Sequence, residues 1–111
     1  MRSAALSRAL HFDPMTIIVT KFGTILTSRQ AGKEAYAAFL PLLMNVDAQE
    51  QVLVDFDGVN AFSPSWGDEF LTPLQKMFGD RLVLKNISNP SVALTIKMLE
   101  KINGAPFKTI E

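Results

Sequence analysis

The chain contains no cysteine and a single histidine, His11. Without cysteine it has no disulfide, no thiolate metal site and no cysteine nucleophile. One histidine leaves little material for a histidine-based catalytic dyad or a multi-histidine metal site. The sequence therefore predicts no catalytic residue, no metal and no cofactor, and the missing cysteine fits a cytoplasmic location.

Neither sign of charge is in excess, because 11 Lys and Arg residues balance 11 Asp and Glu residues. Broad attraction to nucleic acid needs clustered basic residues, so nucleic acid is not an expected partner. The longest apolar run, 35–44, is interrupted by Pro41. It is about half of the roughly 20 residues that a membrane-spanning helix needs, so no membrane contact is expected.

A length of 111 residues, 48 % of them apolar, suits one domain with one modest core. Residues 1–14 precede the first strand pattern and are predicted to be a disordered or extension tail. The folded domain is expected over 15–104. Residues 105–111 follow the last helix pattern and are predicted to be a C-terminal tail.

Short β-branched or apolar runs predict the strands. Residues 16–22 and 25–26, separated by the turn residues Gly23 and Thr24, predict an N-terminal hairpin. Residues 51–56 are nearly continuous in apolar side chains, which is typical of a central buried strand. Residues 81–85 predict a further core strand.

Three capping residues followed by apolar residues at helical spacing predict three helices. Thr27 or Ser28 begins the first helix, Ser63 the second and Asn89 the third. Gly32 is expected to let the first helix pack closely on the sheet. The expected buried faces are Ala31, Ala35, Phe39 and Leu42 in the first helix, Gly67, Phe70, Leu71, Leu74, Met77 and Phe78 in the second, and Val92, Ile96, Leu99 and Ile102 in the third.

The resulting order, β-β-α-β-α-β-α, predicts an α/β fold: a small mixed sheet of about four strands with about three helices, largely on one face. Two prolines conflict with the helices. Pro41 is expected to kink or end the first helix, and Pro73 to bend the second at a cost of about 3 kcal/mol.

The most informative stretch reads Val-Asp-Phe-Asp-Gly-Val at 54–59 and Phe-Ser-Pro-Ser-Trp-Gly-Asp-Glu-Phe at 62–70. It resembles STAS domains, which are named for sulfate transporters and anti-sigma-factor antagonists. It is more similar to the STAS-like family of uncharacterised bacterial domains, which reads roughly Asp-Phe-x-Gly-Val, a Ser-rich loop and Asp-Glu-apolar. The resemblance covers about residues 16 to 103.

The resemblance implies a non-catalytic regulatory module for signalling, with a protein partner of the class of regulatory histidine-kinase-like ATPases. It also implies control by phosphorylation of a loop serine. The antagonists carry Asp before that serine, whereas this chain has Ser63 there and Pro64 at the phosphoacceptor position. Ser65, one residue later, matches the loop serine of the STAS-like family and is the expected phosphosite.

The partner-binding or switch loop is expected to include Asp57, Gly58, Ser63, Ser65, Trp66, Asp68 and Glu69. Ser63 is also a simple helix cap. Trp66 is open to two interpretations, as part of the core or as an anchor for the partner. Arg29 is a candidate contact for a phosphate or for an acid of the loop, and a solvated surface role is equally open.

An alternative interpretation is a small nucleotide-binding or hydrolytic domain that uses Asp55, Asp57, Asp68 and Glu69. Paired carboxylates do acid–base work when burial raises the pKa of one of them. However, Asp68 and Glu69 are expected on a solvated helix face, and the chain has no Gly-rich phosphate loop. Asp55 and Asp57 are better explained as acceptors for backbone N–H groups of the loop. The binding module is therefore favoured.

Overall fold

The computed structural model describes residues 15–110, so residues 1–14, with the predicted N-terminal tail and His11, lie outside the described part. A four-stranded sheet has the order β1-β3-β5-β6, and a separate two-stranded ribbon joins β2 to β4. The strands are β1 (Met15–Ile18), β2 (Ile25–Leu26), β3 (Val52–Asp55), β4 (Ala61–Phe62), β5 (Leu82–Lys85) and β6 (Lys108–Ile110). The helices are α2 (Arg29–Leu43), α3 (Pro64–Phe78) and α4 (Pro90–Asn103), with short 3-10 turns η1 (Val19–Phe22) and η2 (Gly79–Arg81).

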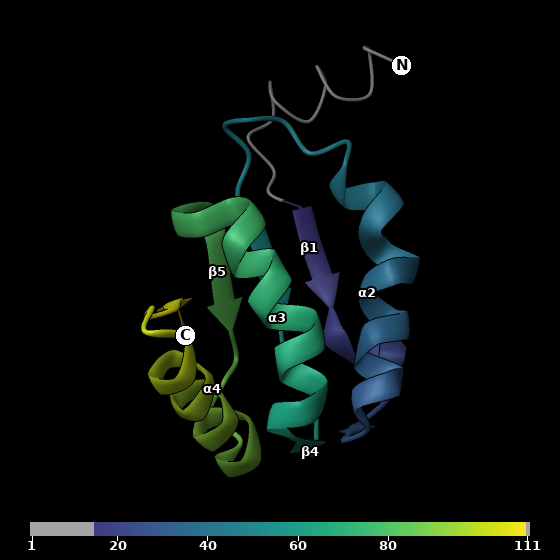
Figure 1. Cartoon of the computed structure of the whole chain (residues 1–111), viewed down its shortest axis with the longest axis vertical. Helices are drawn as coiled ribbons and strands as arrows, with labels where there is room; N and C mark the ends of the chain where they lie inside the picture. The colour runs from purple at the N-terminus through teal and green to yellow at the C-terminus, as the bar shows by residue number, and fades with distance from the viewer. Residues whose placement is uncertain (1–14, 111) are drawn as a thin grey trace.

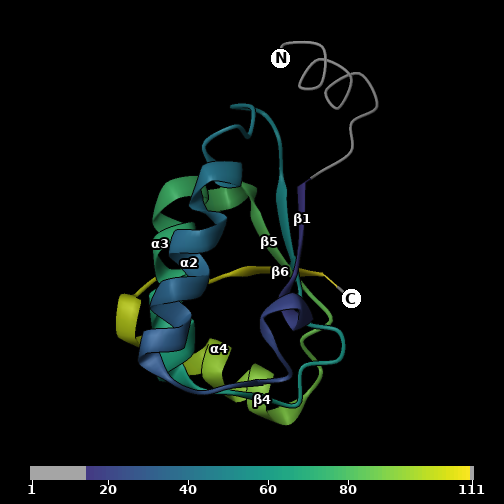
Figure 2. The ribbon, with the colours of Figure 1, turned by 90° about the vertical axis from the view of Figure 1, so that its right-hand side faces the viewer.

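The strand predicted to be central, now β3, is bonded to β1 on one side and to β5 on the other. Because side chains alternate along a strand, Ile17, Val54 and Leu84 point to the same face from adjacent strands. All three are at most 1 % exposed. Figure 2 shows α2 and α3 covering one face of the sheet, and Figure 1 shows them side by side in front of it. The predicted fold class, α/β with a small sheet of four strands and three helices, is confirmed, but every pairing among the described strands is parallel, so the sheet is not mixed as expected.

The predicted N-terminal hairpin is wrong. Residues 19–22 leave the strand as η1, β1 pairs in parallel with β3, and β2 pairs in parallel with β4. Parallel pairing places Ile17 beside Val54 in the core. A hairpin would have given β1 only the two residues of β2 as a partner, so the longer ladder and the apolar contacts with β3 prevail.

The helix caps are confirmed, but the buried faces are partly rotated from those predicted. Ser28, Ser63 and Asn89 each accept a backbone N–H from the first turn of their helix. In α2 the buried residues are Gly32, Ala35 and Leu43 rather than Ala31 and Leu42, and the helix continues past Pro41. Met77 in α3 and Ile102 in α4 are 39 % and 68 % exposed. The positions of neighbouring elements, which sequence spacing does not contain, decide which side of each helix is covered.

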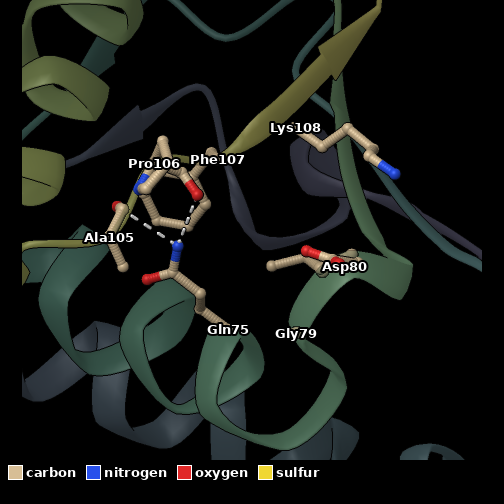
Figure 3. A pocket seen from close by; sticks show the side chains of 8 residues that line it. Gln75, Gly79, Asp80, Ala105, Pro106, Phe107 and Lys108 are labelled. Atoms are coloured by element: carbon tan, nitrogen blue, oxygen red, sulfur yellow. Dashed lines mark hydrogen bonds between the residues drawn. The ribbon is translucent and has the colours of Figure 1, made fainter.

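Residues 105–110, expected to be a tail, instead complete the sheet. β6 pairs in parallel with β5, and Phe107 is 8 % exposed. The Gln75 side chain donates to the carbonyl oxygens of Ala105 (3.3 Å) and Pro106 (3.0 Å), as the dashed lines in Figure 3 mark. These residues line an open hollow of about 280 Å³. Glu100 accepts the backbone N–H of Phe107 at 2.8 Å. Side-chain contacts and strand pairing therefore both hold this segment in place.

Candidate functional site

The β2–β4 ribbon brings the starts of α2 and α3 together at one end of the molecule (Figure 1). Ser63 makes the connection: its N–H donates to the Leu26 carbonyl at 2.9 Å, and its Oγ donates to the Thr27 carbonyl at 2.8 Å. The same Oγ accepts the N–H of Trp66 at 3.2 Å. Ser63 is thus both the cap of α3 and a link to the segment that leads into α2.

Ser65 occupies the second position of α3 and is half-buried. Its hydroxyl forms no hydrogen bond with another described residue. The backbone N–H groups of a first helical turn have no partner within the helix, and the helix dipole favours negative charge there. Of the two loop serines, only Ser65 therefore has a hydroxyl that is not already engaged.

Arg29 at the first position of α2 connects to the second turn of α3. Its Nη1 donates to Glu69 at 2.7 Å and to Asp68 at 3.2 Å. The hydrogen bond to Glu69 and then that to Asp68 raise the pKa of Arg29 above its ordinary value. The Arg29 side chain is 54 % exposed, so solvent screens this pair of contacts. Arg29 therefore contacts two acids of α3 while most of its side chain remains solvated.

Asp55 organises the loop that follows β3. Its Oδ1 accepts the N–H of Asp57 at 2.9 Å and the Nδ2 of Asn86 at 2.8 Å. Gly58 has a φ of 86°, a conformation that side-chain-bearing residues rarely adopt, so the turn at this point requires glycine. The predicted loop-capping role of Asp55 is confirmed. Sequence reasoning missed Asn86, whose only signal was its place directly after a core strand.

Trp66 is 1 % exposed and belongs to the core. Its ring lies 4.9 Å from that of Phe70, 5.8 Å from that of Phe62 and 5.9 Å from that of Phe22. The interpretation of Trp66 as an anchor for a partner is therefore wrong, because the whole side chain is already buried by the aromatic residues of its own domain.

The four carboxylates of the alternative interpretation do not form one group. Asp68 and Glu69 bind Arg29, and Thr72 also donates to Asp68 at 2.9 Å. Asp55 is occupied by Asn86 and by its own loop. Within residues 15–110 no three His, Asp or Glu side chains are grouped so that they could hold a metal ion. The geometry gives no support to a hydrolytic or nucleotide-binding site at these acids.

A scan against protein families matches residues 31–92 to the family described as "STAS-like domain of unknown function (DUF4325)". The match covers more than half of the 111 residues. The chain belongs to this STAS-like family. No curated protein and no solved structure matches it. The STAS-like match runs from the first turn of α2 into the first turn of α4. It includes Asp57, Gly58, Ser63, Ser65, Asp68 and Glu69, but neither Arg29 nor the sheet-completing strands β1 and β6.

No helix among residues 15–110 is long and apolar enough to cross a membrane.

Proposed function

We propose that this STAS-like domain is a non-catalytic regulatory module that binds a protein partner, and that phosphorylation of Ser65 controls the binding. The partner-binding area, called the switch surface below, consists of Asp57, Gly58, Ser65, Asp68 and Glu69. The observation that carries the proposal is the unengaged hydroxyl of Ser65 at the second position of a capped helix. A phosphate there lies at the favourable end of the helix dipole, beside the N–H of Ser65, whereas the N–H groups of Trp66 and Gly67 already bond to Ser63.

Ser63 is the weaker candidate for modification. Its Oγ is engaged with the Thr27 carbonyl and with the Trp66 N–H. A phosphate on Ser63 would break both contacts and uncap α3. The proposal therefore assigns Ser63 to structure and Ser65 to regulation.

Phosphorylation of Ser65 would change the charge of the part of the switch surface that lies on α3. Asp68 and Glu69 lie three and four residues after Ser65, on the same side of α3. A phosphate brings about −1.5 to −2 charges next to them. It would also compete with both carboxylates for Arg29, which is the cation bound to them. A partner that binds the unmodified surface would then meet strong repulsion or a rearranged Arg29.

The family resemblance suggests a partner of the regulatory histidine-kinase-like ATPase class, or a signalling assembly. The test uses the full chain as bait in a bacterial lysate and maps its phosphopeptides. Binding to the co-purified partner is then measured for Ser65→Asp, Ser65→Ala and the parent. We expect Asp to weaken binding at least about tenfold, equivalent to about 1.4 kcal/mol, and Ala to have little effect.

The matched control is Gln49→Asp, which adds the same charge at an exposed position in the loop at the opposite end of the molecule (Figure 1). Circular dichroism of each variant checks that it is folded. The proposal is wrong if Ser65→Asp and Gln49→Asp bind equally well and no phosphate is found on Ser65.

A further inference from the structure

The outer side of α4 carries a row of exposed apolar side chains. Leu94, Met98 and Ile102 are 61 %, 41 % and 68 % exposed. They are spaced four residues apart, so they follow one line along the helix surface. The opposite side of α4 is buried through Val92, Thr95, Ile96 and Leu99. The three exposed residues, called the α4 stripe below, therefore lie outside the buried side that packs this helix onto its own domain.

The other exposed large apolar residues of the described chain do not form such a row. Ile25 is in β2, Leu42 and Met44 are at the end of α2, Met77 is in α3 and Ile110 is in β6. Apolar residues scattered singly on a surface are normal, whereas contiguous ones indicate an interaction site. The α4 stripe places three apolar residues on the exposed side of one 14-residue helix. Helices bind each other through apolar rows of this kind.

The charged border of the α4 stripe is basic. Lys97 and Lys101 lie three and seven residues after Leu94 and run along one side of the stripe. Neither lysine forms an ion pair with a described residue. Glu100 is the only acid in α4, and its carboxylate accepts the N–H of Phe107 instead. The border thus presents two cations that pair with no acid among residues 15–110.

This charge pattern decides whether a second copy of this chain or a different protein binds the α4 stripe. In a symmetric dimer the same patch meets itself, and the exposed side of α4 offers no acid that could pair with the lysines of the other copy. Like charges held at a helix–helix contact oppose association, whereas Lys and Glu on the borders of two helices select each other. We propose that the α4 stripe binds an amphipathic helix of a different protein whose apolar row is bordered by Asp and Glu. This surface is separate from the switch surface and does not depend on the function proposed for it.

The test uses the full chain labelled with ¹⁵N and two synthetic amphipathic peptides with the same leucine positions. One peptide has Glu at the bordering positions, and the other has Lys. We expect the Glu peptide to shift the backbone amide signals of residues 94–102, and the Lys peptide to bind at least about tenfold more weakly. The affinity for the Glu peptide should fall with added salt, because the attraction is between exposed charges.

Variants of exposed residues separate the apolar and the charged contributions. Leu94→Gln with Met98→Gln should abolish the shifts, and Lys97→Glu with Lys101→Glu should make the Lys peptide the better ligand. Met44→Gln, at an exposed apolar residue outside the stripe, should leave binding unchanged. The inference is overturned if neither peptide shifts these amides or if both bind equally. It is also overturned if sedimentation shows that the chain dimerises through residues 94–102, since the occupant would then be a second copy.

Discussion

The carbonyl oxygen of Trp66 lies 2.6 Å from the position that a Cβ atom on Gly32 would occupy. The Cα of Trp66 is 3.0 Å from the same point. The backbones of α2 and α3 therefore touch where each helix begins, and only glycine leaves the room for this contact. The β2–β4 ribbon holds the two helix starts at one end of the molecule, and they approach this closely only because Gly32 has no side chain.

We expect Gly32→Ala to destabilise the domain by about 1–3 kcal/mol, the usual cost of overpacking. In an open helix the same change would stabilise by about 1 kcal/mol, because alanine is the better helix former. Urea denaturation of Gly32→Ala and of the parent measures the change in the free energy of unfolding. Lys33→Ala, at the exposed neighbouring position, should stay within about 0.5 kcal/mol of the parent. A higher denaturation midpoint for Gly32→Ala would show that the helices move apart without cost.

Phe70→Ala should cost about 3–5 kcal/mol, since Phe70 is fully buried among the aromatic rings. Met77→Ala in the same helix provides the comparison. Met77 is 39 % exposed, so its truncation should cost well under half as much. Equal denaturation midpoints for the two variants would mean that the buried side of α3 has been assigned wrongly.

The features that the sequence predicted correctly depend on residues close together in the chain. Ser63 with Pro64, and Asn89 with Pro90, define helix starts within two positions. The apolar run of β3 likewise identifies a strand buried between neighbours. The hairpin prediction failed because strand partners are chosen over long separations: Ile25 pairs with Ala61.

The C-terminal strand could not be predicted for a different reason. All three residues of β6 are exposed, so it has no apolar pattern, and it is held by Phe107 and by the side chains of Gln75 and Glu100. At the site, the cap and the loop serines were predicted from local sequence. The sequence left the partner of Arg29 open and gave no sign that Asn86 reaches Asp55, because both contacts join separate elements.

Phe107→Ala should destabilise the domain by about 3 kcal/mol, at the lower end of the range for a buried phenylalanine because 8 % of Phe107 remains exposed. It should also speed hydrogen exchange at Thr109 and Ile110, as β6 loses its nearest anchor. Ile110→Ala, at a residue 47 % exposed, should have a much smaller effect on stability. If residues 105–110 contribute nothing to stability, Phe107→Ala will have the same urea denaturation midpoint as the parent.

Arg29→Ala should lower the urea denaturation midpoint only slightly, although Arg29 contacts both Asp68 and Glu69. The side chain is 54 % exposed, so water and salt screen the attraction. The small difference in denaturation midpoint between Arg29→Ala and the parent should shrink further in 1 M sodium chloride, where the Debye length is about 3 Å. A large fall in the denaturation midpoint that persists in high salt would mean that Arg29 is needed for packing rather than for charge.

Ser63→Ala should cost about 1–2 kcal/mol, because it removes the cap of α3 and also the bond to the Thr27 carbonyl. Ser65→Ala should stay within about 0.5 kcal/mol, because the Ser65 hydroxyl makes no hydrogen bond within the described chain. Ser63→Thr keeps a hydroxyl that can make both contacts and should restore most of the stability lost in Ser63→Ala. Thermal and urea unfolding of the three variants would rank them. If Ser65→Ala proved the more damaging, the structural and regulatory roles given to the two serines would have to be exchanged.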